Sequence, residues 1–335
     1  MSQPLFDLIG VGNPIMDLLA PVPESFLTEA GGAKGGMVHV DSAEIGRLVA
    51  KLDAPPTVIP GGSVANTIVG AARLGLSATY LGKIGHDDTA RAYHAHFVSS
   101  GADGARFKHG ALPNGRCLAL VTPDGQRTLR TFLGAAISLH PDEISAEDFR
   151  GVRHAHIEGY LLFNPALAEK AVSMARAAGC TVSIDLASFE VVKSAREWIF
   201  AQLRAGLHAV FANEDEARAL FADGAEYPEL ARRLAGYGGI AAVKLGKDGA
   251  WIAQDSNLHR IEPVTVPHVV DTTGAGDAWA AGFLFGWLRG ASLPAAGAIG
   301  SLLGAETVQH LGPAIPETRW PALRRQADRI ASDQT

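Results

Sequence analysis

The segment 271–277 (DTTGAGD) constrains this chain more than any other feature. Spaced valines between residues 264 and 270 predict a strand that ends at Asp271, and the apolar run 278–288 predicts a helix. A glycine-rich turn between a strand and a helix leaves backbone N–H groups at the helix start free to bind an anion. The segment therefore predicts a site that handles phosphate.

Asp277 stands in the first turn of the predicted helix, where the helix dipole favours the ionised carboxylate. A carboxylate beside an anion hole can take a proton from an alcohol while phosphate charge is being stabilised. The spacing thus indicates a general base next to a phosphate site.

Composition narrows the class of protein. The 335 residues are 47% apolar and 19% charged, which is typical of a globular protein with ample core. A net charge of −6 without a basic run argues against a nucleic-acid or anionic-membrane binder. Cys117 and Cys180 are too far apart to indicate a disulfide framework or a zinc site. With no signal-peptide pattern and no apolar run long enough to span a bilayer, we expect a cytoplasmic protein.

Strand-like and helix-like segments alternate along the chain, which favours an α/β fold with a mostly parallel sheet and helices on both faces. Strands are expected at 6–11, 78–81, 157–162, 181–184, 209–211 and 241–245, and helices at 65–74 and 164–178. Three of the strands approach Asp185, Asn213 and Gly246, at the sheet edge where ligands collect in such folds.

Four strand-like segments interrupt this alternation: 15–22, 37–40, 116–121 and 127–132. The sequence PDG at 123–125, between the last two, is a strong hairpin signal. We therefore expect a single domain over residues 1–335 with a small β-sheet lid, formed by inserted segments at about 13–41 and 105–133.

Other motifs allow two interpretations. The sequence GVGNPI at 10–15 follows a strand, as a dinucleotide motif does, but it lacks the third glycine and contains Pro14, so an oxidoreductase is disfavoured. The sequence GGSVAN at 61–66 either forms a loop and helix cap or presents N–H groups and the Asn66 amide to a polyhydroxylated ligand. Asp17, a lone acid in an apolar strand, faces either solvent or a ligand.

Two further segments lie on the expected ligand edge. The sequence NEDE at 213–216 either suits the dipole of a helix start or, through Asn213 and Glu216, holds water around a magnesium ion. The sequence VKLGKDGA at 243–250 is a strand–turn–strand unit whose glycines either serve the turn or let the backbone approach a nucleotide.

In this order, the motifs resemble the ribokinase-like (PfkB) carbohydrate kinase family over roughly residues 6–320. Its two signatures are matched at 61–66 and, more specifically, at 271–278, and the segments 12–17, 213–216 and 245–249 match in position. The resemblance implies a three-layer α/β/α ribokinase-like fold with a β lid over a sugar site. It also implies ATP and Mg²⁺ as cofactors.

The resemblance also implies roles for single residues. Asp277 would deprotonate a primary CH2OH group, with Gly274, Ala275 and Gly276 as the anion hole. Residues that would hold the acceptor are Asn13, Asp17, Gly61, Gly62 and Asn66. Residues that would bind the nucleotide are Asn213, Glu216, Lys244, Gly246 and Gly249, with Glu216 reaching Mg²⁺ through water. Asp271 and Thr273 match positions at which many family members bind a monovalent cation such as K⁺.

Within the family, the chain is more similar to bacterial adenosine-kinase-like members than to ribokinase proper. The supporting stretches are 34–37, 131–135, 158–161 and 185–190. Phe132 on the lid either stacks on a purine or packs inward as a core residue. Ala136 and Trp279 depart from the pattern of sugar-kinase relatives and leave the acceptor open.

We therefore expect an ATP-dependent phosphotransferase that acts on the primary alcohol of a nucleoside or a sugar, as a monomer or a homodimer. A free-sugar kinase of the ribose or fructose type is one alternative. A catalytically silent nucleoside- or sugar-binding protein on the same scaffold is another.

Overall fold

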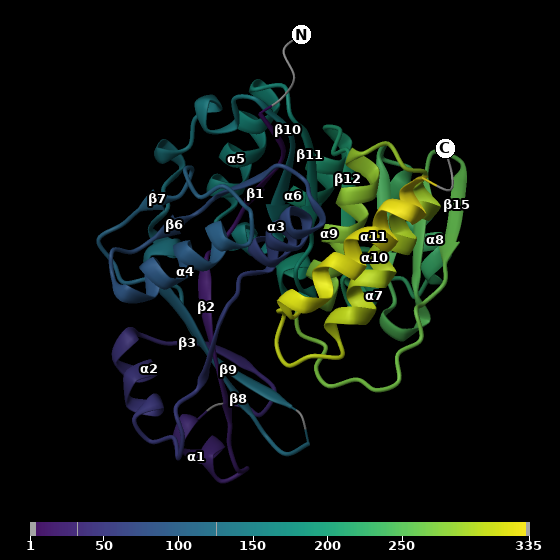
Figure 1. Ribbon diagram of the computed structural model, residues 1–335. Helices are drawn as coiled ribbons and strands as arrows, with labels where there is room; N and C mark the ends of the chain where they lie inside the picture. Colours follow the sequence, from purple (N-terminus) through teal and green to yellow (C-terminus); the bar gives the residue numbers. More distant parts are fainter. Residues whose placement is uncertain (1–4, 32, 125, 333–335) are drawn as a thin grey trace.

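The computed structural model describes residues 5–31, 33–124 and 126–332, and an eight-stranded sheet forms its centre (Figure 1). In spatial order the strands are β15 (Asn257–Ile261), β14 (Ala250–Gln254), β13 (Ile240–Lys244), β12 (Ala209–Asn213), β11 (Thr181–Asp185), β10 (Val152–Glu158), β1 (Phe6–Val11) and β5 (Ala78–Leu81). All neighbours from β5 to β13 are parallel, and the pairs β13–β14 and β14–β15 at one edge are antiparallel. The mostly parallel sheet is confirmed.

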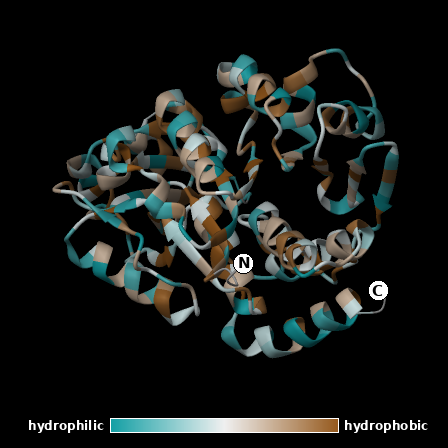
Figure 2. Cartoon of the chain, turned by 90° about the horizontal axis from the view of Figure 1, so that it is seen from above, coloured by the Kyte–Doolittle hydropathy of each residue, from teal (hydrophilic) through white to brown (hydrophobic). Residues whose placement is uncertain are grey.

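Helices cover both faces of the sheet because its strands are buried on both sides. One face carries α5 (Pro165–Ala177), α6 (Phe189–Arg204), α7 (Glu214–Phe221) and α8 (Tyr227–Ala235). The other carries α3 (Ser63–Leu74), α4 (Asp88–Ser99), α9 (Ala275–Leu288), α10 (Leu293–Thr307) and α11 (Trp320–Ser332). The outermost of these, α11, is mostly hydrophilic and buries only Trp320, Leu323 and Ala327 (Figure 2). The three-layer α/β/α fold is confirmed.

Helix ends follow the expected local chemistry. Helix α3 ends at Gly75, whose φ of 114° is readily adopted only by glycine. Helix α5 begins with Pro165 after Asn164, and the Asn164 side chain accepts a hydrogen bond from the Leu167 N–H. Both helices therefore lie close to their predicted ranges.

A second sheet of five strands projects from the body and forms the lid (Figure 1). Its order is β3 (Met37–His39), β9 (Arg127–Phe132), β8 (Gly115–Val121), β2 (Ile15–Pro21) and β4 (Thr57–Pro60). The helices α1 (Phe26–Ala30) and α2 (Ser42–Val49) accompany it, and an apolar cluster that includes Ile45 and Leu118 fills the space beside α2. Strands β8 and β9 form the expected antiparallel hairpin, although Gly125 of its turn lies outside the described residues.

The predicted lid boundaries need two corrections. Strand β4 belongs to the lid sheet but was not predicted. Conversely, the segment from residue 105 to 114 lies with the body, because β7 (Lys108–His109) pairs with β6 (Lys83–Ile84) in a separate two-stranded sheet.

Two predicted strands were wrong. No strand forms at 264–270, where Val264, Val269 and Val270 are exposed, because Pro263 and Pro267 lack the N–H groups that a ladder needs. The strand expected at 157–162 instead spans β10, five residues earlier, and a 3-10 turn (Gly159–Phe163) follows it. Two buried histidines in β10 concealed its first half.

Within the described ranges, no helix combines the length and apolarity needed to cross a membrane.

Candidate active site

The carboxyl ends of the parallel strands bring polar residues to one edge of the central sheet. They are Asn13 after β1, Glu158 at the end of β10, Asp185 at the end of β11, Asn213 at the end of β12 and Lys244 at the end of β13. Strand order changes direction at β1, which lies between β5 and β10. Ligands bind at such switch points in open α/β sheets.

The glycine-rich turn leads into α9 at the same edge. Gly274 is the N-cap with φ of 72°, and a Cβ atom there would overlap Pro313, so only glycine fits. The Ala275 N–H donates to the Thr272 carbonyl. A Cβ on Gly276 would lie 3.4 Å from Lys244 Nζ, which puts that ammonium beside the first turn of α9. Backbone N–H groups at a helix start and a lysine together favour an anion.

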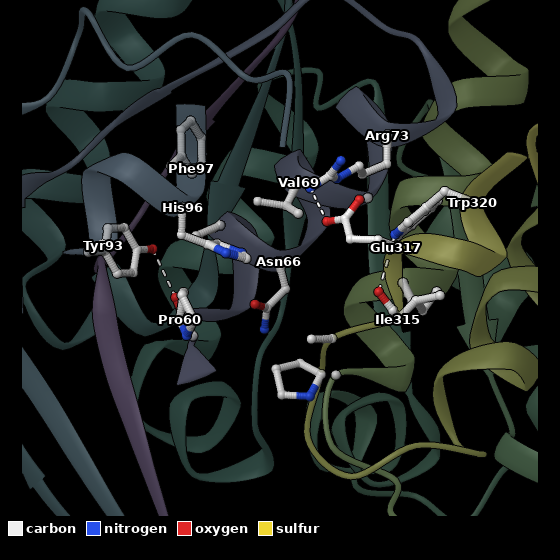
Figure 3. Close-up of a pocket in the computed structure, with 17 residues that line it drawn as sticks. Pro60, Asn66, Val69, Arg73, Tyr93, His96, Phe97, Ile315, Glu317 and Trp320 are labelled. Carbon is white, nitrogen blue, oxygen red and sulfur yellow. Dashed lines mark hydrogen bonds and ion pairs between the residues drawn. The ribbon is translucent and has the colours of Figure 1, made fainter. Parts of the chain in front are cut away.

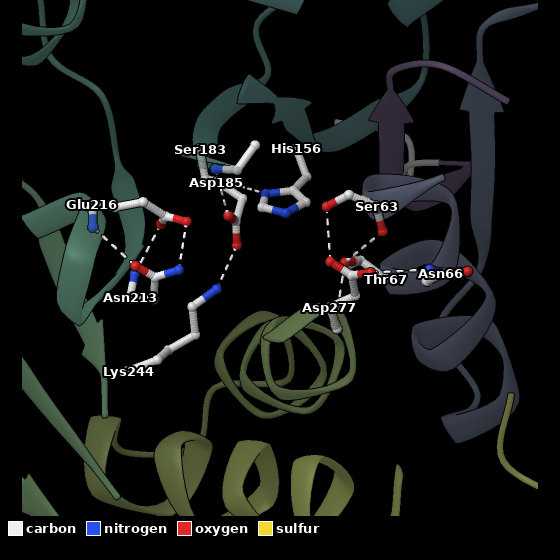
Figure 4. A network of polar contacts seen from close by, with 11 residues as sticks. Ser63, Asn66, Thr67, His156, Ser183, Asp185, Asn213, Glu216, Lys244 and Asp277 are labelled. Carbon is white, nitrogen blue, oxygen red and sulfur yellow. Dashed lines mark hydrogen bonds and ion pairs between the residues drawn. The ribbon is translucent and has the colours of Figure 1, made fainter. Parts of the chain in front are cut away.

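Asp277 is held by the first turn of α3 (Figure 4). Its Oδ1 accepts a hydrogen bond of 2.8 Å from Ser63 Oγ, and its Oδ2 accepts one of 2.9 Å from Asn66 Nδ2. Desolvation raises the pKa of Asp277 to about 6, although the Asn66 hydrogen bond opposes that rise. The half-buried carboxylate is therefore ionised at neutral pH and has a fixed orientation.

Lys244 forms a buried ion pair with Asp185, with 2.7 Å between Nζ and Oδ2. Burial alone would lower the pKa of Lys244, but the carboxylates of Asp185 and Glu216 raise it. The lysine is therefore a permanent cation at the site. Asp185 was not among the predicted site residues, although its place after a strand was visible in the sequence.

Asn213 and Glu216 form a reciprocal cap at the start of α7 (Figure 4). Both carboxylate oxygens of Glu216 accept hydrogen bonds from Asn213, at 2.9 and 2.7 Å. Burial, and then the charge of Asp185, raise the pKa of Glu216 to about 7. Among the described residues, no group of three or more His, Cys, Asp or Glu side chains is placed to hold a metal ion. These contacts form a helix cap, as one of the two interpretations of this motif expects.

The predicted acceptor residues come together between the lid and α3. The backbone of Gly61 lies so close to Asp17 that a Cβ atom would overlap its carboxylate. Gly62 has φ of 95°, and a Cβ there would lie 2.5 Å from the Asn13 carbonyl oxygen. Desolvation raises the pKa of Asp17 to about 7, which Arg127 opposes. The two glycines thus permit close approach of the chain to the Asp17 carboxylate and to the Asn13 backbone.

Glu158 was missed because the strand that carries it was misplaced. It is buried, and it accepts hydrogen bonds from Asn13 Nδ2 at 2.9 Å and from the Val64 N–H at 3.2 Å. Burial raises its pKa to about 7. Glu158 thereby ties the β1–β2 connection to the start of α3.

Phe132 lies on the face of the lid sheet opposite to the one that carries Asp17. It pairs with Arg116 across β8 and β9 and packs against the lid's apolar cluster beside α2. Asp17 pairs in register with Cys117, the residue after Arg116, and successive side chains of a strand point to opposite faces. The packing agrees with the core interpretation of Phe132 and does not place the ring beside Asp17.

Asp271 joins the segment before α9 to the lid. Its carboxylate forms an ion pair with Arg127 of β9 and accepts hydrogen bonds from the N–H groups of Gly312, at 2.7 Å, and Thr273, at 3.0 Å. Arg127 was not predicted, because its partner lies 144 residues away. These contacts already provide the carboxylate of Asp271 with a cation.

The two glycines expected to bind nucleotide lie in the turn after β13. Gly249 has φ of 82°, and a Cβ atom would overlap the Ile261 carbonyl, so the turn itself requires glycine. Gly246 has φ of 49° and is exposed. The two departures from the family pattern are both buried: Ala136 lies in a 3-10 turn, and Trp279 stacks on Phe283 with 5.5 Å between ring centroids.

A small cavity of about 60 Å³ lies behind Asn66, between α3, α4 and the segment 313–320 (Figure 3). Tyr93 Oη donates to the Gly61 carbonyl at 2.9 Å, and Arg73 forms an ion pair with Glu317 at its wall. The cavity borders Gly61, whose backbone lies close to Asp17, so it lies next to the predicted acceptor residues.

Comparison with known proteins agrees with this geometry. The pfkB family carbohydrate kinase model matches residues 45–320. Adenosine kinase of Saccharomyces cerevisiae is 25% identical over 93% of this chain and 97% of its own. An uncharacterized sugar kinase of Archaeoglobus fulgidus is 29% identical over 73% of this chain and 96% of its own. The structure of adenosine kinase from Sinorhizobium meliloti is 31% identical, with a TM-score of 0.85 over 96% of this chain and 99% of its own. The structure of a probable sugar kinase from Rhizobium etli is 31% identical, with a TM-score of 0.86 over 97% of this chain and 99% of its own. The chain therefore belongs to the pfkB family of carbohydrate kinases and is a phosphotransferase.

Proposed function

We propose that the protein transfers the γ-phosphoryl group of ATP to the primary CH2OH group of a nucleoside, with adenosine as the favoured acceptor. The observation that carries this proposal is the position of Asp277. Its carboxylate is fixed by Ser63 and Asn66 at the start of α9, close to the Lys244 ammonium. A base and an anion site side by side are what phosphoryl transfer to an alcohol requires.

Each residue then has a defined task. Asp277 takes the hydroxyl proton, while Lys244 and the N–H groups that follow Gly274 stabilise charge on the transferred group. Asp17 accepts hydrogen bonds from acceptor hydroxyls beside Gly61 and Gly62, and Asn13 borders the same space. Because phosphoryl transfer needs little covalent help from protein, positioning and electrostatics supply most of the rate.

Mg²⁺ supplies charge neutralisation on the nucleotide phosphates when it is bound. Mg²⁺ keeps several of its waters in such sites, so few protein ligands are needed. The buried Glu216–Asn213 cap would face it through water, and Gly246 and Gly249 would border the nucleotide. A cation role for Asp271 and Thr273 predicts that replacing Na⁺ with K⁺ in the assay raises turnover; equal rates in both salts would remove that role.

The choice of a nucleoside rests on how much of the chain its relatives match. The adenosine kinases of Saccharomyces cerevisiae, Arabidopsis thaliana and Schizophyllum commune align with 92–95% of this chain. The sugar kinase of Archaeoglobus fulgidus and the ribose-1-phosphate kinase of Halopiger xanaduensis align with 73–75% of it, although the probable sugar kinase structure from Rhizobium etli covers 97%. An alignment over nearly the whole chain takes in more of the residues that surround the acceptor than one over three quarters of it, and this supports a nucleoside.

One observation favours a free-sugar kinase instead. Phe132 faces the lid's apolar cluster, which leaves no aromatic ring from that position to stack on a purine. Asp17 and the glycine loop suit the hydroxyls of a free sugar as well as those of a ribose moiety.

Measurement of ADP formation with adenosine, inosine, guanosine, ribose and fructose separates these functions. We expect the highest kcat/KM with adenosine, and a sharp rise of the adenosine KM in Asp17→Ala with ATP binding unchanged. A higher kcat/KM with a free sugar would select the alternative. Acceptor binding by calorimetry without any ADP formation would instead indicate a silent binding protein.

A further inference from the structure

Four polar side chains are joined in a chain along the central sheet. His154 and His156 extend from β10, and Thr181 and Ser183 lie at the paired positions of β11. Ser183 Oγ lies 2.7 Å from His154 Nε2 and 2.8 Å from His156 Nδ1. Thr181 Oγ1 lies 2.7 Å from His154 Nδ1. Three hydrogen bonds therefore connect all four side chains.

Aromatic side chains surround this network of four polar side chains. The edge of Trp287 meets His154 at 5.0 Å between ring centroids, and Phe211 meets His156 at 5.4 Å. Both histidines and Ser183 are fully buried. Apolar side chains would fill this layer without the cost of removing polar atoms from water, so the network calls for a role besides packing.

The network runs along two central strands, from His156 near the carboxyl end of β10 to Thr181 at the amino end of β11. At the inner end, His156 Nε2 is buried and has no hydrogen-bond partner among the described residues. In Figure 4 this ring is drawn between Asp185 and Ser63, whose hydroxyl donates to Asp277, and the charges of Asp185 and Lys244 act on the ring. At the outer end, Thr181 begins β11, is half-buried and donates to a backbone carbonyl at 3.2 Å. The network thus leads from the active site to the amino end of β11.

Both rings are neutral, so each carries one proton. Burial lowers the pKa of His156 to about 4, with Asp185 opposing and Lys244 adding to the shift. Burial also holds the pKa of His154 far below its usual range, and the neighbouring charges of His208 and Arg153 act in the same direction.

The protons of a hydrogen-bonded network of neutral side chains can be arranged in two complete orders. In the first, His156 Nδ1–H donates to Ser183, Ser183 donates to His154 Nε2, and His154 Nδ1–H donates to Thr181. In the second, every bond is reversed, and His156 Nε2 carries the proton of its ring. All three hydrogen bonds are satisfied in both orders.

We propose that this hydrogen-bonded network of His156, Ser183, His154 and Thr181 is a proton relay that serves Asp277. The proposal rests on the phosphotransfer function above, in which Asp277 gains the proton of the acceptor hydroxyl. A water held between the unpaired His156 Nε2 and the carboxylate would bridge the two groups, since a buried polar atom without a partner favours such a water.

The transfer balances at every step. The Asp277 proton passes through the water to His156 Nε2, and the His156 Nδ1 proton moves to Ser183. The Ser183 proton moves to His154 Nε2 and the His154 Nδ1 proton moves to Thr181. The half-buried Thr181 hydroxyl then turns away from the Arg153 carbonyl and passes its proton to solvent water. One proton enters and one leaves, so Asp277 regains its charge while the lid is still closed. Once the site opens, His156 Nε2 gives its proton to water in the site and Thr181 takes one from solvent, which restores the first order.

A single-turnover experiment tests the relay with MgATP and the acceptor that performs best in the screen. ADP formation is followed by rapid quench, and proton release by a pH-indicator dye in stopped flow. In the wild type, we expect proton release to keep pace with ADP formation. Ser183→Ala cuts the chain at its centre, so proton release should fall behind ADP formation, and Ser183→Thr should restore the synchrony.

The matched control is Thr79→Val, which removes another buried hydroxyl of the same sheet, bonded to Asp103. This variant should show no delay. Synchronous release in Ser183→Ala would overturn the relay. If the wild type forms no ADP with any acceptor, the proposed function fails instead, and the relay is decided in the unliganded protein.

That second measurement uses the ¹⁵N signals of the histidine rings, which report which nitrogen carries the proton. As Asp277 titrates near its pKa of about 6, His154 and His156 should exchange tautomers together. Asp277→Asn and Ser183→Ala should each abolish the joint change. Fixed, independent tautomers in the wild type between about pH 5 and 8 would overturn the proposal.

Discussion

Asp277 combines two opposing influences at the scale of a single residue, since desolvation raises its pKa and the Asn66 hydrogen bond lowers it. We expect Asp277→Asn to lower kcat by about 10²–10⁴-fold, the range of one general base. Nucleotide affinity should change little, because backbone N–H groups and Lys244 supply the anion site. Steady-state kinetics and calorimetry measure both quantities, with Asp88→Asn, exposed on α4, as the control. Nearly normal turnover in Asp277→Asn would reject Asp277 as the base.

Asn66 offers a pH test of the same residue. The base must be ionised, so kcat of the wild type should fall as the pH drops through about 6. Asn66→Ala removes a hydrogen bond that stabilises the carboxylate, so the pKa of Asp277 should rise further. The acidic limb of the kcat–pH profile should therefore move to higher pH. An acidic limb that stays in place or moves to lower pH would show that Asn66 does not set this pKa.

At the scale of elements, Glu158 joins β10, the β1–β2 connection and α3. Its pKa rises from 4.5 to about 7 on burial, so the folded state binds its proton more tightly than the unfolded state does. The wild type should therefore lose stability relative to Glu158→Gln as the pH rises from 4.5 to 7, by up to about 3 kcal/mol. Chemical unfolding at both ends of this range measures the difference, with the exposed Glu147→Gln as control. A pH-independent difference between wild type and variant would contradict the assigned burial.

The elements also show what sequence patterns can predict. Parallel strands with continuous apolar runs, such as β11 and β13, were located because burial on both faces leaves a local signal. The apolar alternation at 264–270 misled because two prolines prevent pairing, and β10 was misplaced because buried histidines resemble exposed ones. Glycine motifs located Asp277, and the strand end at Asp185 was visible, but the pairing of Asp185 with Lys244 and of Arg127 with Asp271 appeared only in the structure. Pairing between elements sets these contacts, and no local pattern records it.

At the scale of the whole molecule, Arg127 connects the lid sheet to the body through Asp271. The same guanidinium also lowers the pKa of Asp17, so it links lid position to the charge on the acceptor side. Arg127→Met should weaken the lid contact and leave more of Asp17 protonated at neutral pH. We expect a higher acceptor KM, together with more ATP hydrolysis in the absence of acceptor, because an open lid admits water.

Arg116→Met is the matched control, since Arg116 lies on the adjacent lid strand β8 but bonds to Ser42 within the lid. ADP formation with and without acceptor, measured for both variants, separates a lid–body effect from general disturbance of the lid sheet. If the pair holds the closed form, raising the pH should partly restore acceptor affinity in Arg127→Met, because the remaining Asp17 protons are then lost. Equal acceptor KM and equal background hydrolysis in the two variants would mean that the Arg127–Asp271 pair does not control closure.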